Sequence, residues 1–436
     1  MTESDATSDD RPLAFTVEST ERRARVGRGS VGHGDFETPA FLPVASHGSV
    51  QGLTPRDLWE TGTQLVVADA FDLTVSPGEE TVEKHAGLHR MMGWLGPLVT
   101  HSGSESAFEM PDVEVDESGV TADSDLLDHP VELTPEESIA IQETLGADII
   151  LAFDVSHPHP CEYDRARDGV DRTARWLKRC ADAHSRSDQA LFGIIQGSVY
   201  PDLRGRSTEK TLDVELPGYA IGGLAGGERH ESTMEMLDHT VSQLPDDKPR
   251  YLPGVGHPED VVEGVARGVD LFDCAVPTSH AHSGIVYSRR GRMTLTHREY
   301  RNDRFPLDAN CNCYACRNFS RAYIRHLIET EAILGTSLVA VHNLTFYQDL
   351  MRTIRRSIES EVFQQFRFAF LDEYLSDRRA RELNLFRLED AYDLAALEWD
   401  TTHSVLPPTE VDEETARIDP YDNFASPEER IGEITG

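Results

Sequence analysis

Seven short apolar segments, separated by amphipathic stretches, constrain the fold of this chain more than any other feature of the sequence. They read QLVVADA, PLVTHS, DIILAFDV, ALFGIIQGS, GYAIGGLA, RYLPGVG and VDLFDCAV, between residues 64 and 276. The stretches between them carry helix start signals: in LTPEESIAIQETLGA, Thr134 stands as the expected N-cap before Pro135. Alternating strands and helices predict a parallel α/β fold. The length and the number of units favour a (β/α)8 barrel over the alternative, a doubly wound sheet.

Polar residues that suit a catalytic site stand at the ends of these apolar segments. In a (β/α)8 barrel, catalytic side chains come from the C-terminal ends of the strands. Position alone leaves Asp273 open as a nucleophile at a sugar carbon or as a helix N-cap or solvated turn residue. It also leaves His101 open as a site residue or a plain loop histidine. The rule selects Asp69, His101, Asp154, Gln196, Gly223 and Asp273.

The 436 residues are long enough for one large domain or for two to three small ones. We expect a disordered acidic N-terminus over residues 1–12, a barrel domain over 13–375 and an acidic, Pro-punctuated extension over 376–436. No run of 18 apolar residues predicts a transmembrane helix, and the N-terminus lacks the basic and then apolar pattern of a signal peptide. The expected location is therefore the cytoplasm, away from any membrane.

The formal net charge of −36 arises from acids that are dispersed along the chain, which contains only four lysines. This pattern favours a protein from a high-salt cytoplasm, where screening relieves the repulsion between acids. The competing interpretation is an acidic scaffold that avoids nucleic acid. A nucleic-acid substrate is not excluded, but its binding surface would have to be a local arginine patch.

Three of the six cysteines lie within six residues, at Cys311, Cys313 and Cys316, and His342 follows 26 residues later. Three thiolates and one imidazole suit a tetrahedral Zn²⁺ site, and four protein ligands leave no position for substrate. We therefore expect a structural zinc site in a subdomain over about residues 305–345. The alternatives are three buried free thiols, or His326 as the fourth ligand.

Longer motifs carry a family resemblance over residues 13–375. The segments ALFGIIQGSVYPDLRGRS, GYAIGGLAGGE, KPRYLPGVGHPEDVVEGVARGVDLFDCAVPT, CNCYACRNFSRAYIRHL and VAVHNLTFYQDLM resemble those of tRNA-guanine transglycosylases, especially the bacterial-type enzymes of the queuosine pathway. The resemblance implies a (β/α)8 barrel with a zinc subdomain, in which an aspartate attacks the ribose of an encoded guanine. A free 7-deazaguanine then displaces the enzyme from the tRNA. Family members dimerise around the zinc subdomain, which implies a homodimer or a heterodimer with a related subunit.

The resemblance also assigns roles to residues of this chain. The nucleophile falls on Asp273, the proton-transfer position falls on His101, and the zinc ligands fall on the three cysteines and His342. The base-recognition positions are Asp154, Gln196 and Gly223, with the neighbouring loop Ser102, Gly103, Ser104 and Glu105. The positions that would contact RNA are Gly254, Val255, Gly256, His257, Pro258, Glu259, Asp260, Thr278, Ser279, His280, Ala281 and His282.

Several of these positions depart from the family pattern. The family reads T-D-S-G-G-[FY]-Q where this chain reads THSGSES, so His101 replaces an aspartate and Glu105 replaces the aromatic residue that stacks on the base. Pro253 replaces a methionine of the base sandwich, and Ser279 and His282 replace two arginines that grip RNA. Two interpretations follow. The chain is a transglycosylase with a shifted base or nucleic-acid preference, or it is a non-catalytic paralogue that partners an active relative.

Overall fold

The computed structural model describes residues 11–110, 113–122 and 130–376. The predicted disordered N-terminus and the predicted acidic C-terminal extension lie almost wholly outside these residues. Among the described helices, none is long and apolar enough to cross a membrane.

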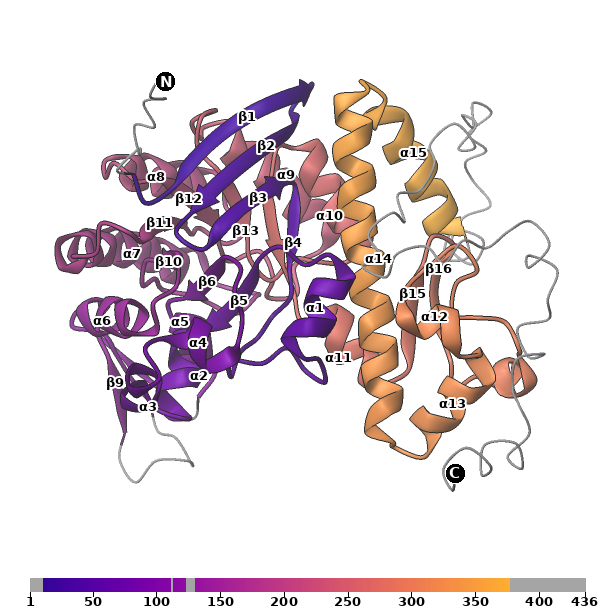
Figure 1. Cartoon of the computed structure of the whole chain (residues 1–436). Coiled ribbons are helices and arrows are strands. Elements are labelled where there is room, and N and C mark those ends of the chain that lie inside the picture. Colours follow the sequence, from indigo (N-terminus) through magenta and orange to yellow (C-terminus); the bar gives the residue numbers. More distant parts are fainter. Residues whose placement is uncertain (1–10, 111–112, 123–129, 377–436) are drawn as a thin grey trace, which may run out of the picture. The chain divides into compact units, whose positions relative to one another are not determined.

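Eight parallel strands form the central sheet (Figure 1), and backbone hydrogen bonds join its two edges. The Ala45 N–H donates to the Val67 carbonyl at 2.6 Å and the Val67 N–H donates to the Pro43 carbonyl at 3.1 Å, which joins the first strand to the last. The predicted (β/α)8 barrel is therefore confirmed, and the doubly wound alternative is wrong because an open sheet has two free edges. In spatial order, the strands are β4 (Ala40–Leu42), β14 (Leu271–Asp273), β13 (Arg250–Leu252), β12 (Gly218–Ile221), β11 (Ala190–Ile195), β10 (Ile149–Leu151), β6 (Leu98–His101) and β5 (Val66–Asp69).

Helices follow the strands at the positions that the start signals indicate. The Thr134 hydroxyl accepts a hydrogen bond from the Glu137 N–H, and the Glu137 side chain accepts one from the Thr134 N–H, which forms the capping box at the start of α6. The helices are α1 (Pro55–Thr61), α2 (Ala70–Val75), α3 (Glu79–Lys84), α4 (Leu88–Met92), α5 (Ser104–Phe108), α6 (Pro135–Leu145), α7 (Tyr163–Ala183), α8 (Pro201–Leu212), α9 (His230–Val241) and α10 (Pro258–Ala266). A small sheet of β7 (Glu114–Val115), β8 (Val120–Ala122) and β9 (Val131–Leu133) stands between α5 and α6.

An antiparallel sheet of β1 (Ala14–Glu21), β2 (Ala24–Val31) and β3 (Gly34–Thr38) covers the N-terminal end of the barrel. Leu13 and Phe36 pack in one apolar cluster with residues from the starts of the barrel strands, such as Ile149 and Leu271. Burial of these side chains stabilises the closed end, since removing apolar area from water contributes about 25 cal/mol per Å². This end of the barrel is therefore filled with side chains.

The C-terminal elements form a second layer beside the barrel. Helix α14 runs between the barrel and the segment that holds the cysteines (Figure 1). The Gln348 side chain of α14 donates to the Phe41 carbonyl of β4 at 3.0 Å, which ties the helix to the barrel wall. The remaining elements are α11 (Val276–His282), β15 (Ile285–Ser288), β16 (Gly291–Thr294), the 3-10 helix η1 (Arg298–Asn302), α12 (Tyr314–Asn318), α13 (Arg321–Glu329), α14 (Ile333–Glu359) and α15 (Phe363–Tyr374).

Candidate functional site

The six residues selected by the barrel rule all lie at the C-terminal ends of barrel strands. Asp69 and His101 are register partners at the ends of β5 and β6, and Asp273 is the last residue of β14. A cavity of about 710 Å³ opens at this rim. Its lining includes His101, Ser102, Gly103, Ser104, Glu105, Asp154, Gln196, Gly223 and Pro253. Asp273 is not part of that lining but lies beneath it, with 3% of its surface exposed.

One corner of the cavity holds a rigid set of hydrogen-bonding groups. Asp154 is 2% exposed, and its two oxygens accept hydrogen bonds from the Ser104 hydroxyl and the Gln196 amide, each at 2.5 Å. Burial raises the pKa of Asp154, while these two hydrogen bonds oppose the rise. Gly223 has a φ of +62°, and a Cβ atom there would lie 2.3 Å from Gln196 Oε1. Only glycine therefore fits beside the Gln196 amide.

A second set of contacts connects Asp273 to His101 through a tyrosine. The Tyr251 hydroxyl donates to Asp273 Oδ1 at 2.7 Å, and the Gly254 N–H donates to the same oxygen at 3.2 Å. His101 Nε2 lies 2.8 Å from the Tyr251 oxygen and 3.7 Å from Asp273 Oδ1. Because the single Tyr251 proton is donated to Asp273, His101 Nε2 must be the donor in its contact with Tyr251.

Tyr251 was missed by the sequence analysis, because in RYLP it reads as one more apolar strand residue. It is 1% exposed, and burial together with the charge of Asp273 raises its pKa well above the usual value. The hydroxyl therefore keeps its proton. The signal that could have identified it is the alternation of β13, which points Tyr251 into the barrel between two residues that point outward.

Asp69 adds a further carboxyl group near His101. Burial, followed by the neighbouring charge of Asp72, raises the pKa of Asp69 to about 6, and His101 opposes that rise. The Asp69 carboxylate also accepts the Asp72 N–H at 3.1 Å and so caps α2. Glu105 is exposed and lines the cavity.

The residues predicted to contact RNA are divided between a second cavity and α11. The second cavity, of about 820 Å³, adjoins the first at Ala225. Of the predicted residues, it is lined by Gly254, Val255, Gly256, His257, Glu259 and Asp260, whereas Pro258 is buried at the start of α10. On α11, Ser279 and His282 are exposed, His280 is half-buried, and Thr278 and Ala281 are buried. Buried side chains cannot reach a polymer, so the surface that α11 offers is smaller than the sequence suggested.

The four predicted metal ligands lie together. One ligand atom from each of Cys311, Cys313, Cys316 and His342 lies within 4.8 Å of all the others. His342 Nδ1 faces Cys316 Sγ at 3.2 Å, and its Nε2 lies 2.8 Å from the Tyr287 carbonyl, so the Nε2 proton is held there and Nδ1 is free to bind a metal. These four residues can hold a metal ion, and His326, the alternative fourth ligand, does not belong to the group.

Comparisons with known proteins agree with these observations. A family model described as queuine tRNA-ribosyltransferase matches residues 19–376. The queuine tRNA-ribosyltransferase of Halothermothrix orenii is 47% identical over 355 residues, which cover 81% of this chain and 95% of that protein. The corresponding protein of Desulforamulus reducens is 46% identical over 363 residues, covering 83% of this chain and 98% of that protein. The corresponding protein of Francisella tularensis subsp. novicida is 42% identical over 363 residues, which cover 83% of this chain and 99% of that protein.

Proposed function

The chain belongs to the queuine tRNA-ribosyltransferase family, and we propose that it replaces a guanine of tRNA by a 7-deazaguanine. The observation that carries the proposal is the hydrogen-bonded row of Asp273, Tyr251 and His101, which reaches the cavity at His101, together with Asp154 and Gln196 in the same cavity. A nucleophile and a proton carrier thus stand beside a pocket that suits a planar polar base. The residue roles below are part of this proposal.

In the first half of the reaction, Asp273 attacks C1′ of the ribose. The bond between C1′ and guanine N9 breaks, and an ester between Asp273 and C1′ forms. Both hydrogen bonds to Asp273 use Oδ1, so we assign Oδ2 as the attacking oxygen. Tyr251 and Gly254 hold the carboxylate in one orientation, which lowers the entropic part of the barrier. His101, in its protonated form, gives its proton to the departing guanine.

In the second half, the incoming 7-deazaguanine occupies the same pocket. Its N9 attacks C1′, the ester bond breaks, and Asp273 leaves as a carboxylate. Neutral His101 takes the N9 proton, which returns the site to its starting state. Imidazole can both give and take a proton near neutral pH, so histidine can serve at a position where the family has an aspartate. Asp154 and Gln196 would hydrogen-bond the edge of either base, which carries both donors and acceptors.

We assign Zn²⁺ to the cluster of three cysteines and His342, as a structural ion. The donor set supports this, since three thiolates and one imidazole suit tetrahedral zinc. Two of the thiols also accept backbone hydrogen bonds: Cys313 Sγ from the Cys316 N–H and Cys316 Sγ from the Asp308 N–H, both at 3.4 Å. Such bonds help to orient the sulfur atoms as ligands. Zinc bound there would fix α12 against α14.

The partners we propose are tRNA, a free purine or 7-deazaguanine base, and a second copy or a related subunit. Exposed apolar side chains around the cysteine cluster support the last of these. Phe305 is 69% exposed and Ile333 is 81% exposed, and Tyr314, Leu334 and Tyr323 are also exposed. Light scattering at high salt should give twice the mass of one chain. The net charge of −36 supports a high-salt cytoplasm as the setting for these encounters.

The test of the proposed function is exchange of radiolabelled guanine into mixed tRNA at high salt. Asp273→Ala should abolish incorporation. His101→Ala should slow it by roughly 10²–10⁴-fold, the usual contribution of a positioned acid or base. The exposed His85 provides a matched control, and His85→Ala should retain full activity. Full exchange by Asp273→Ala would overturn the nucleophile assignment. No exchange by the wild-type chain, with metal and fold intact, would favour the non-catalytic paralogue.

A further inference from the structure

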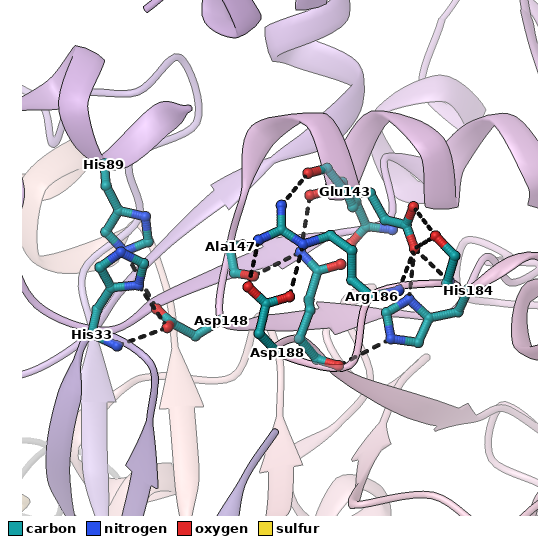
Figure 2. A network of polar contacts seen from close by, with 11 residues as sticks. His33, His89, Glu143, Ala147, Asp148, His184, Arg186 and Asp188 are labelled. Carbon is teal, nitrogen blue, oxygen red and sulfur yellow. Dashed lines mark hydrogen bonds and ion pairs between the residues drawn. The ribbon is translucent and has the colours of Figure 1, made fainter. Parts of the chain in front are cut away.

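We propose that His33, His89 and Asp148 form a second metal site, for a divalent ion such as Zn²⁺, Co²⁺ or Ni²⁺, at the N-terminal end of the barrel. His33 lies in the turn between β2 and β3, His89 lies on α4, and Asp148 immediately precedes β10. Figure 2 shows both imidazoles directed at the Asp148 carboxylate. The site lies at the opposite end of the barrel strands from Asp273 and does not depend on the proposed base exchange.

The three potential ligand atoms lie close enough together to bind one ion. His33 Nδ1 lies 2.8 Å from Asp148 Oδ1, and His89 Nε2 lies 3.3 Å from Asp148 Oδ2. All three ligand atoms lie within 4.8 Å of one another. His89 Nε2 also lies 3.1 Å from the Gly96 carbonyl oxygen, which offers a fourth donor. Two imidazoles with oxygen donors suit borderline ions better than Mg²⁺ or Ca²⁺, which prefer oxygen alone.

The carboxylate is built into the protein rather than free on its surface. Asp148 is 3% exposed, and it accepts the Leu98 N–H on Oδ2 at 2.9 Å and the His33 N–H on Oδ1 at 3.1 Å. These bonds fix the orientation of the carboxylate, as expected of a ligand supported by neighbouring groups. Each imidazole nitrogen that faces Asp148 therefore carries a proton. A divalent ion would bind the lone pair of each of these nitrogens, and the proton of each neutral ring would then sit on its other nitrogen.

The two imidazole rings are stacked, with centroids 3.6 Å apart and planes inclined by 15°. Parallel rings direct their nitrogen lone pairs side by side, so coordination of one ion requires the rings to splay. The His33 side chain is 45% exposed and can rotate toward solvent, while the His89 side chain is 11% exposed and stays in place. The ion would link three segments that are distant in sequence and would hold the β2–β3 turn against the barrel.

The test is metal stoichiometry of the full, untagged chain, first loaded with zinc and then dialysed against Co²⁺ or Zn²⁺. The wild-type chain should bind two ions, and His33→Ala and His89→Ala should each bind one. His85→Ala, which removes an exposed histidine nearby, should still bind two. At an ion concentration roughly 100-fold above Kd, the ion should raise Tm of the wild type by about 3 °C and leave that of His33→Ala unchanged.

Cobalt spectra identify which site fills. Cobalt at the cysteine cluster would give intense sulfur charge-transfer absorption, whereas cobalt at His33, His89 and Asp148 would give only weak d–d bands. Because the His33 side chain is far more exposed than that of His89, His33→Ala should fold even if His89→Ala does not. A wild-type chain that saturates at one ion would overturn the proposal. Retention of the second ion by both histidine variants would overturn it as well.

Discussion

Replacing Asp69 by asparagine should stabilise the protein at neutral pH. The carboxyl group at the end of β5 is 7% exposed, and burial raises its pKa from 3.8 to about 6. The folded chain therefore holds this proton more tightly than the unfolded chain does. Stability falls as the pH rises from about 4 to about 6, and the full penalty is present above that window. Asparagine carries no charge and is an equally good N-cap for α2, so Asp69→Asn removes the penalty.

The size of the effect follows from the two pKa values. A difference of about 2.2 units corresponds to about 3 kcal/mol at pH 7.5, because each unit is about 1.4 kcal/mol. At pH 5, where the folded group is largely protonated, the penalty is about 1.5 kcal/mol. A chain of this length has an unfolding entropy of about 0.8 kcal/mol/K near Tm. The gain in Tm should therefore be about 4 °C at pH 7.5 and about 2 °C at pH 5.

Scanning calorimetry at a fixed scan rate over pH 5 to 8 measures this difference. The difference between variant and wild type at each pH cancels effects that both share, such as loss of metal at low pH. Asp182→Asn, at an exposed position of α7, is the matched control and should follow the wild type at every pH. A gain in Tm that does not change with pH would refute the reasoning. So would a loss of stability at pH 7.5.

Three further predictions concern the metal, the base pocket and the RNA surface. Cys313→Ala should lose the ion of the cysteine cluster and lower Tm, as metal analysis and calorimetry would show; retention of that ion would contradict the ligand assignment. Gly223→Ala should raise KM for guanine by about 10²-fold because its Cβ displaces the Gln196 amide, and an unchanged KM would contradict this. Ser279→Arg combined with His282→Arg should tighten binding to anticodon-loop RNA. The slope of the logarithm of the binding constant against the logarithm of salt concentration should become steeper by up to about 2. Unchanged affinity and slope in binding titrations would mean that another surface binds the RNA.

The strand pattern predicted most of the barrel but not its first strand. Seven apolar segments correspond to β5, β6, β10, β11, β12, β13 and β14. Strand β4 was not among them, because Ala40–Leu42 is only three residues long and lies between two prolines. The β1–β3 sheet was missed too. Its strands β1 and β3 alternate between more buried and more exposed residues, but they carry few large apolar side chains, so they were not among the apolar segments.

Sequence reasoning located the site residues better than it located their contacts. The barrel rule selected Asp69, His101 and Asp273, because strand ends converge at one rim whatever the loops do. The hydrogen bonds through Tyr251 could not be predicted, since they depend on how strands β6, β13 and β14 lie across the barrel. The spacing of the cysteines left two histidines possible as fourth ligand. Only the packing of α14 against α12 distinguishes His342 from His326.

The sheet that covers the N-terminal end of the barrel closes that end, and the cavity opens at the opposite end, at the rim formed by the strand ends. A molecule that enters at the strand ends cannot leave through the other end, because Leu13 and Phe36 fill it. In the proposed reaction, the expelled guanine and the incoming base would both pass through the strand-end side of the barrel. A shared route favours ping-pong kinetics, in which guanine leaves before the new base enters. Guanine and the new base then compete for the same covalent intermediate. A high concentration of free guanine would then return the covalent form to guanine-containing tRNA and so slow the net exchange.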